Sequence, residues 1–519
     1  MAYYVGLDLG TSGCKAGVIE VGGRLKAAHQ REYRFAGNEL WAMECDAELV
    51  WNLSAECVRR AVADSGVDPR EIKAIGLSVL GEAAMPVDEH GKPLRPGIHA
   101  LDSRGGHYGE YVNWWRERFG PLKVFQVTSY PLSFLPTVMK MMWVRDHEPE
   151  LFKRAYKYCT FQDFTVWKLA GAPAIDYAMA SRTMLFDVVN HRWSREFLEA
   201  AGISEELLSP AYESTAQVGE VTEVAARATG LRPGTAVVVG CSDQAAAAVA
   251  VGAVREGVVM NGAGSSEAIG TPTRHPLTSE DMMLRGQGSQ CHVRRDLWLA
   301  LGFHLTCGHL VKWTRDQLGQ LEKEREARGE SNAYDLITTQ AATSPPGANG
   351  VMVLPHFLGS GTGHIPCLEP ASRGTILGLT VSRSKADIFR AIFEGMNYEV
   401  RLILESLEQA GIAISELKVS GGGAKSPFWL QLKADITQKK VTVPAVTEAS
   451  LFGAGILAAT GVGLYSSLED AVDRTARDVA EYHPNQDLAA TYDRHYQVYK
   501  ELYTGLLPIN RRIQSLTGV

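Results

Sequence analysis

The chain contains 519 residues, of which 45% are hydrophobic and 21% are charged, and its formal net charge is −7 at pH 7. This length predicts two or more domains, and the composition is typical of a globular protein rather than a disordered or fibrous one. The negative charge argues against nucleic acid and anionic membrane surfaces as partners, because both are bound through positively charged patches.

The eight cysteines are scattered and lack the CxxC spacing of a zinc or redox site. They indicate free thiols in a reducing compartment. No run of residues approaches the roughly 20 apolar positions that a membrane span needs. The sequence begins on an apolar strand at Tyr3, without a basic segment before it. We therefore expect a cytoplasmic protein that acts on small molecules.

Residues 4–19 predict a β-hairpin whose glycine-rich turn can bind phosphate. Glycines let backbone amides approach phosphate oxygens, Thr11 and Ser12 offer hydroxyl donors, and Lys15 adds a positive charge. Asp8 lies beside this turn and is available for Mg²⁺, which one or two carboxylates typically hold in phosphoryl sites. An ordinary hairpin with a structural aspartate explains the same residues.

Helical and strand patterns alternate along the rest of the chain, which predicts α/β domains with mixed sheets. A charged run at 322–330 is expected to be a solvated surface loop. The predicted helices are 47–65, 138–145, 161–169, 305–318, 385–409 and 427–438, of which 138–145 and 161–169 are expected to be amphipathic, and the predicted strands include 72–79 and 417–420.

Residues 235–244 predict a buried strand that turns into a helix. Apolar residues 236–239 favour the strand, Gly240 permits the turn, and the alanine-rich residues 245–251 favour the helix. Asp243 therefore lies at the strand-to-helix corner, the edge at which open α/β sheets bind their ligands. A simpler interpretation is that Asp243 only caps the helix.

A second hairpin, at residues 257–271, repeats the pattern of the first one. Two halves of similar length that open with the same hairpin suggest a duplicated domain with a cleft between the copies. We place the boundary near residue 246, so that the domains are 1–246 and 247–519. Asp243 and Asp8 would then hold Mg²⁺ together in the cleft.

Two glycine-rich turns of the second half are further candidate ligand contacts. Residues 261–266 match the turn of the first hairpin, and residues 420–426 place three consecutive glycines between a strand and a helix. Such a run is costly to order unless a ligand approaches the backbone. The absence of G-x-x-x-x-G-K-[ST] excludes a P-loop enzyme. Gly453 begins a loose dinucleotide pattern, but it lies in a predicted small-residue helix, so tight packing explains it better than a nicotinamide dehydrogenase does.

Two stretches resemble signatures of the FGGY carbohydrate kinases, a family that includes glycerol, xylulose, ribulose, gluconate and erythritol kinases. Residues 374–394 resemble the C-terminal signature at every position, and residues 140–147 resemble the end of the N-terminal signature. The resemblance covers nearly the whole chain. It implies an α/β fold of two ribonuclease H-like domains of the actin and Hsp70 class with a catalytic cleft between them, in which the first domain binds sugar and the second binds ATP.

The resemblance also implies roles for individual residues. Asp243 resembles the catalytic base, and Asp8 resembles the aspartate that associates with Mg²⁺. The sugar-contacting positions of the family correspond to Glu82, Asp102, Arg104 and Gln244. Its nucleotide contacts correspond to Thr11, Ser12, Gly262, Gly264, Gly308, Gly422, Gly423 and Lys425, with Ser265 able to substitute for a threonine that is common at the position of Ala263.

Departures from the family pattern leave the sugar open. Glu82 stands where xylulose kinases carry histidine, Ala100 replaces a tryptophan, and His364 stands where many xylulose kinases carry arginine. We expect ATP-dependent phosphorylation of a ketopentose such as xylulose, or of a polyol. A gluconate or autoinducer-2 kinase is the alternative within the family, and an actin-like ATP-gated binding module is the alternative from another class. A homodimer is a family expectation.

Overall fold

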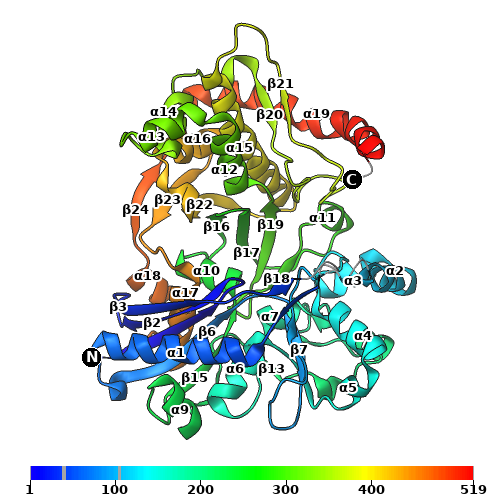
Figure 1. The fold of residues 1–519 in the computed structure, drawn as a ribbon, viewed down its shortest axis with the longest axis vertical. Coiled ribbons are helices and arrows are strands. Elements are labelled where there is room, and N and C mark those ends of the chain that lie inside the picture. Colours follow the sequence, from blue (N-terminus) through cyan, green and yellow to red (C-terminus); the bar gives the residue numbers. More distant parts are fainter. Residues whose placement is uncertain (1, 38–41, 103, 105–106, 518–519) are drawn as a thin grey trace.

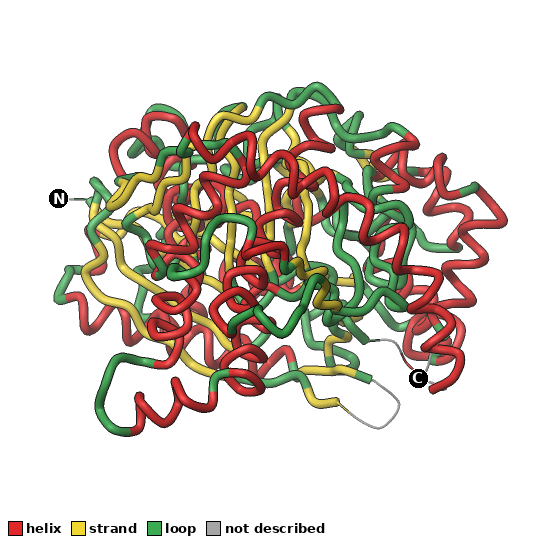
Figure 2. Tube along the Cα trace, turned by 90° about the horizontal axis from the view of Figure 1, so that it is seen from above, coloured by secondary structure: helices red, strands yellow, loops and turns green. Residues whose placement is uncertain are grey.

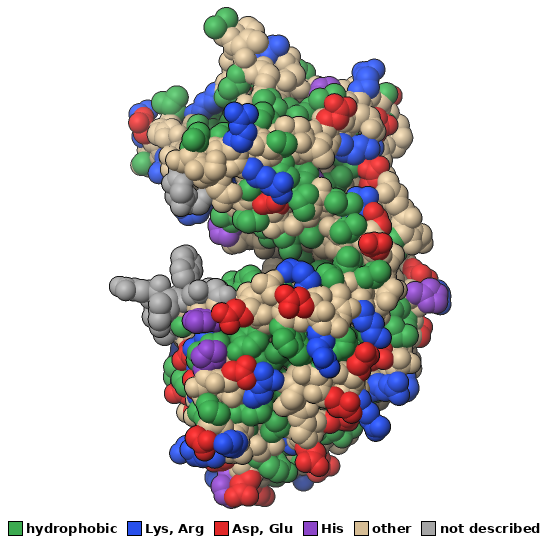
Figure 3. Space-filling model, turned by 90° about the vertical axis from the view of Figure 1, so that its right-hand side faces the viewer, with side chains coloured by type: hydrophobic (Ala, Val, Ile, Leu, Met, Phe, Trp, Pro, Cys, Tyr) green, Lys and Arg blue, Asp and Glu red, His purple; other side chains and the backbone are tan. Residues whose placement is uncertain are grey.

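The computed structural model describes residues 2–37, 42–102, 104 and 107–517. The chain forms two lobes, each built around a β-sheet, and Figure 3 shows a deep hollow between them. The first lobe carries the N-terminal half of the chain, and the second carries most of the C-terminal half (Figure 1).

The sheet of the first lobe has the strand order β14-β15-β6-β1-β2-β3. Strand β1 pairs antiparallel with β2 and parallel with β6, and β6 pairs parallel with β15. The predicted hairpin is thus confirmed as the pair of β1 and β2. The strands are β1 (Tyr3–Leu9), β2 (Gly13–Glu20), β3 (Leu25–Glu32), β6 (Ile72–Val79), β14 (Gln217–Glu220) and β15 (Ala236–Ser242).

The two faces of this sheet are covered by helices from different parts of the chain. Side chains alternate along a strand, so Val5 and Leu7 face a core shared with α1 (Ala47–Ser65), whereas Tyr4 faces a core shared with α17 (Ala449–Gly461). Helix α17 belongs to the C-terminal half, yet it packs on β1, β6 and β15 (Figure 1).

Small residues allow α17 to pack closely against the neighbouring helix and strand. A β-carbon at Gly453 would collide with the carbonyl of Ala246 in α10 (Asp243–Ala250), and one at Gly6 would collide with the carbonyl of Leu451. The prediction that Gly453 reports tight helix packing is confirmed. Helices α10 and α17 therefore touch almost backbone to backbone at the junction of the lobes.

The remaining elements of the first lobe surround its sheet. The helices expected at 47–65 and 161–169 are present, the second ending one residue later. The other helices are α2 (Tyr108–Phe119), α3 (Pro121–Thr128), α4 (Thr137–His147), α5 (Pro149–Lys153), α6 (Phe161–Ala170), α7 (Tyr177–Ser181), α8 (Arg195–Ala201) and α9 (Glu223–Thr229), and the short strands are β4 (Ala36–Gly37), β5 (Met43–Cys45), β7 (Ala84–Val87), β8 (Gly97–Ile98), β9 (Lys157–Thr160), β10 (Ile175–Asp176), β11 (Phe186–Asp187), β12 (Arg192–Trp193) and β13 (Ala211–Tyr212).

The sheet of the second lobe repeats the arrangement of the first, with the order β18-β19-β17-β16-β22-β23-β24. Strand β16 pairs antiparallel with β17 and parallel with β22, and β22 pairs parallel with β23. The five central strands of each lobe thus share one order and one set of directions, which confirms the duplication. The strands are β16 (Gly257–Ala263), β17 (Glu267–Thr273), β18 (Ser289–Cys291), β19 (Trp298–His304), β22 (Ile414–Ser420), β23 (Lys440–Pro444) and β24 (Asp478–Tyr482), and a separate pair is β20 (Met352–Leu354) with β21 (Thr375–Leu377).

Helices flank the strands of the second lobe, as the view from above shows (Figure 2). Helix α15 has the predicted bounds of 385–409 and carries a Ser384 capping box. The helices are α11 (Glu280–Leu284), α12 (Cys307–Leu318), α13 (Gln320–Ala327), α14 (Ala333–Ala341), α15 (Lys385–Gln409), α16 (Pro427–Thr437), α18 (Leu468–Thr475) and α19 (Gln486–Thr517).

Two sequence predictions were wrong. The charged run at 322–330 is not a loop, because residues up to Ala327 form α13, where Glu322 turns inward to pair with Lys385 at 2.6 Å. Helices α4 and α6 are not amphipathic, because most side chains of each are buried, including Lys140 in α4 and Asp163 in α6. Each of the eight cysteines is free, as predicted. Within the described ranges, no helix combines the length and apolar character needed to cross a membrane.

Candidate active site

Asp243 is placed by the turn between β15 and α10. Gly240 has φ of 77°, and a β-carbon there would collide with the carbonyl of Leu77 on the neighbouring strand, so only glycine fits. Helix α10 begins at Asp243, and Ser242 occupies the N-cap position without a side-chain capping hydrogen bond. The Asp243 carboxylate accepts the backbone N–H of Gln244 at 2.7 Å rather than an amide one turn ahead. Helix capping therefore does not account for Asp243.

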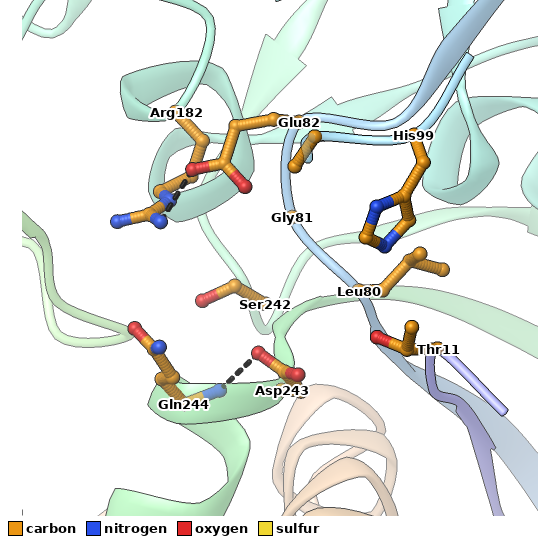
Figure 4. Close-up of a pocket in the computed structure, with 10 residues that line it drawn as sticks. Thr11, Leu80, Gly81, Glu82, His99, Arg182, Ser242, Asp243 and Gln244 are labelled. Carbon is orange, nitrogen blue, oxygen red and sulfur yellow. Dashed lines mark hydrogen bonds and ion pairs between the residues drawn. The ribbon is translucent and has the colours of Figure 1, made fainter. Parts of the chain in front are cut away.

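Asp243 faces a cavity of about 150 Å³ (Figure 4). Asp243 and Gln244 line one side, and Glu82 and Arg182 line the opposite side. The cavity is also lined by Thr11, Leu80, Gly81, His99, Ala100 and Ser242.

An ion pair forms the wall opposite Asp243. The guanidinium of Arg182 pairs with the Glu82 carboxylate, which also accepts the hydroxyl of Tyr130 at 2.8 Å. The Arg182 guanidinium lies 4.9 Å from the centre of the Tyr130 ring. Glu82 has φ of 59°, a strained value that the surrounding contacts must stabilise. The charges of the pair compensate each other, so this wall presents polar groups with little net charge.

Sequence reasoning predicted Glu82 and missed Arg182. Arg182 lies a full hundred residues further along the chain, after α7, and its sequence context contains no glycine turn or signature residue. Only the fold brings the two side chains together.

The two aspartates predicted to hold Mg²⁺ lie in an electrostatically unfavourable environment. Burial raises the pKa of Asp243 to about 6. Burial also raises the pKa of Asp8 to about 7, and the negative charge of Asp243 adds to this increase. Asp8 accepts the hydroxyl of Ser78 at 2.6 Å. Two nearby carboxylates with raised pKa values form a site at which a divalent cation would be favourable.

Lys15 and Ser12 do not line the cavity beside Asp243. The ammonium group of Lys15 pairs with Glu448 at 2.7 Å, at the start of α17. Thr11 lines the cavity beside Asp243. The contacts of these three residues with nucleotide remain predictions.

Asp102 and Arg104 also lie outside the lining of the cavity beside Asp243. Asp102 is fully buried and accepts the backbone N–H of Met43 at 2.7 Å. Arg104 pairs with Asp102 at 3.2 Å and with Glu44. The wall that faces Asp243 thus contains Glu82 and Arg182 rather than this pair, and sugar contacts from Asp102 and Arg104 remain predictions.

Lys140 supports the edge of the same cavity from behind. Its buried ammonium group donates to the carbonyls of Ala100, Phe134 and Leu135 at 3.0, 2.7 and 2.7 Å. Burial lowers the pKa of Lys140 to about 7. Ala100 lines the cavity, and its small side chain fills less of this wall than a tryptophan would.

The second lobe contains a larger cavity of about 580 Å³, a size typical of cofactor and small-ligand sites. It brings together three of the predicted segments, because the amide of Gly308 donates to the carbonyl of Gly264 at 2.9 Å and Gly421 lies against Ala263. The predicted residues that line it are Gly264, Ser265, Gly308, Gly422, Gly423 and Lys425, whereas Gly262 does not.

Sequence reasoning missed the outer wall of this cavity. Tyr334, Asp335 and Thr338 come from α14, and Asn332 caps that helix. The Asn332 cap and the helical spacing indicate only a helix, so the sequence contained no signal for binding here. His364, which stands where many xylulose kinases carry arginine, lies among buried residues of the second lobe and lines neither cavity.

Comparisons with known proteins find relatives that match almost the full length of the chain. The chain is 27% identical to xylulose kinase from Bacillus subtilis over 519 residues, covering 99% of each chain. It is 29% identical to autoinducer-2 kinase from Yersinia enterocolitica over 514 residues, covering 98% of this chain and 95% of the relative.

Solved structures share the fold. The crystal structure of ligand-bound xylulose kinase from Lactobacillus acidophilus superposes with a TM-score of 0.88 at 22% identity and covers 98% of both chains. Plasmodium falciparum glycerol kinase with ADP superposes with a TM-score of 0.83 at 19% identity, covering 97% of this chain and 98% of that chain. At this level of identity the likeness establishes the two-domain α/β fold.

Family models settle the relationship. The model for the N-terminal domain of the FGGY family of carbohydrate kinases matches residues 3–250, and the model for its C-terminal domain matches residues 259–462. Together they cover most of the chain and both lobes, each with its cavity. The protein therefore belongs to the FGGY family of carbohydrate kinases.

Proposed function

We propose that the protein transfers the terminal phosphoryl group of ATP to a hydroxyl of a small uncharged carbohydrate, a ketopentose such as xylulose or a polyol. The observation that carries the proposal is the cavity in which Asp243 faces the Glu82–Arg182 pair. The sugar would bind in this cavity in the domain of residues 1–246, and the nucleotide would bind in the larger cavity of residues 247–519.

Asp243 would act as the general base. A sugar hydroxyl is a weak nucleophile, and a carboxylate within hydrogen-bond reach can accept its proton as the new bond to phosphorus forms. A base works best when its pKa lies near the working pH, and burial raises the pKa of Asp243 to about 6. Gln244 and Glu82 offer hydrogen-bonding groups that would orient the other hydroxyls.

Asp8 and Asp243 would hold Mg²⁺, which would neutralise charge on the phosphate oxygens. Their donor chemistry fits, since both are carboxylates and both have raised pKa values that a cation would lower. Gly264 and Gly422, which lie in glycine-rich turns, and Gly308, at the start of α12, would let the nucleotide approach the backbone.

The charge of the sugar cavity favours a neutral substrate. Arg182 is already paired with Glu82, so it has little capacity to bind a carboxylate such as that of gluconate. Asp243 lies opposite and would repel an anion. Aldonates are therefore the less favoured alternative.

The test is ADP release by the full chain with Mg²⁺ and ATP against a panel of ketopentoses, polyols, aldonates and autoinducer-2. We expect a neutral sugar or polyol to stimulate release. Asp243→Asn should lower kcat by about 10²–10⁴-fold, the usual contribution of a general base, while nucleotide still binds by calorimetry. Asp88→Asn, in an exposed turn, is the control. Turnover at the wild-type rate in Asp243→Asn, or ATP hydrolysis that no sugar alters, would overturn the proposal.

A further inference from the structure

A buried cluster of two histidines and one glutamate lies in the second lobe, away from both cavities. His356 and His364 belong to the segment that follows β20, and Glu399 lies in the middle of α15. His356 and Glu399 have no exposed surface, and His364 is 7% exposed. One donor atom from each side chain lies within 4.8 Å of the other two.

The donor atoms have the types and the spacing of a metal site. The Nε2 atoms of His356 and His364 lie 3.2 and 2.9 Å from Oε1 of Glu399. Two imidazole nitrogens and one carboxylate oxygen form a common three-residue ligand set for Zn²⁺ and related ions. Metal–ligand bonds of about 2.1 Å in a tetrahedral site separate the donors by about 3.4 Å. The two nitrogen–oxygen distances lie close to this value, and the two imidazoles offer nitrogen atoms within 4.8 Å of each other.

Outer contacts hold the side chains in this orientation. Nδ1 of His356 hydrogen-bonds to Oγ of Ser372 at 2.6 Å, which directs the opposite ring nitrogen, Nε2, toward Glu399. The hydroxyl of Tyr499 donates to Oε1 of Glu399. The ring of Tyr503 lies 4.3 Å from the ring of His364, between centroids. Ligating histidines in metalloproteins are oriented by second hydrogen bonds of this kind.

The charge of the cluster also favours a cation. Among the described residues, the only ion-pair partners of Glu399 are the two imidazoles, and no Lys or Arg lies within 4.0 Å of it. A carboxylate with no solvent contact is stabilised by a full positive charge nearby. A bound divalent ion would supply that charge.

We propose that His356, His364 and Glu399 bind one divalent transition-metal ion, with Zn²⁺ as the expected occupant. The ligands come from the segment of residues 356–364 and from α15, and Tyr499 and Tyr503 on α19 complete the surroundings. The ion is structural and fixes these segments together. The proposal does not depend on the proposed function, because these residues line neither cavity.

The experiment is a Zn²⁺ titration of the full chain by calorimetry after treatment with a chelator. We expect one equivalent to bind, and Co²⁺ in its place to give the visible absorption of a four- or five-coordinate site. His364→Ala should abolish both signals. His483→Ala is the matched control, because His483 forms a His–Glu pair with Glu481 on the surface and should leave binding unchanged.

Glu399→Gln provides a second variant if His364→Ala fails to fold, since the amide keeps the shape of the side chain and is a much weaker ligand. It should lower Zn²⁺ affinity at least tenfold and abolish the rise in melting temperature that Zn²⁺ produces in the wild-type chain. Absence of stoichiometric Zn²⁺ binding to the wild-type chain would overturn the proposal and leave the cluster as a hydrogen-bonded network. Full-strength binding in His364→Ala or in Glu399→Gln would also overturn it.

Discussion

The buried ion pair of Lys433 and Glu267 allows a quantitative test of what stabilises the hairpin of β16 and β17. Lys433 on α16 pairs with Glu267, and their side chains are 1% and 0% exposed. Although burial opposes ionisation, the charge of Lys433 keeps the pKa of Glu267 at about 2. Asn261 on β16 donates to the same carboxylate at 2.8 Å. The pair therefore anchors the strands that lead into the glycine turn of the larger cavity.

Lys433→Met should destabilise the second lobe strongly, because it leaves the Glu267 carboxylate buried without its cation. Removing one partner of a buried ion pair costs about 3–5 kcal/mol. At about 2–4 °C per kcal/mol for a domain of this size, the melting temperature should fall by about 6–20 °C. The double variant, which combines Lys433→Met and Glu267→Met, should recover most of this loss. A well-packed apolar pair often matches a buried ion pair in stability.

Scanning calorimetry of the full-length variants measures these shifts. The control is Lys440→Met, which removes a partly exposed pair with Glu481 at 2.6 Å and should cost about 0–1 kcal/mol. A single variant at Lys433 that melts with the wild-type protein would refute the reasoning. A double variant as unstable as the single one would refute it equally, since the cost would then not arise from the unpaired charge.

The two aspartates and the wall of the sugar cavity yield the remaining predictions. The value of kcat/KM for the sugar should fall about tenfold per pH unit below pH 6, because burial raises the pKa of Asp243 to about 6 and the protonated form cannot accept a proton; a constant rate from pH 5 to 8 would contradict this. Asp8→Asn should stop turnover and yet raise the melting temperature at pH 8 more than at pH 5. Burial raises the pKa of Asp8 from 3.8 to about 7, so its contribution to stability is highest at low pH and is lost as pH rises through 7; a pH-independent difference in melting temperature would count against it. Arg182→Met should raise KM for the sugar at least tenfold and leave KM for ATP unchanged, because Glu82 loses its partner in the cavity wall; Arg255→Met, at an exposed pair with Asp473, should change neither constant.

The elements of the fold could be predicted where the local pattern is strong. Helix 385–409 has a capping residue at Ser384 and a continuous apolar face, so its bounds follow from the sequence alone. The corner at Asp243 follows from an apolar strand, a glycine and an alanine-rich helix. By contrast, the charged run at 322–330 contains no turn residue before Gly329, and charge alone was a poor guide to a loop.

Site residues could be predicted where ligand binding requires a recognisable local sequence pattern. The turns of residues 261–266 and 420–426 were predicted from their glycines, and Gly264 and Gly422 line the larger cavity; Gly308, which also lines it, was expected only from the family resemblance. Arg182 and Tyr334 lie in no such sequence pattern, because tertiary packing alone places each of them at its cavity. The partner of Glu82 was therefore inaccessible to sequence reasoning, although Glu82 itself was found.

The packing of α17 on the first lobe has a consequence for any attempt to separate the halves of the chain. A fragment ending at residue 246 would lack the helix that covers one face of its own sheet, and Tyr4 and Gly6 would become open to water. Such a truncation should aggregate rather than bind sugar.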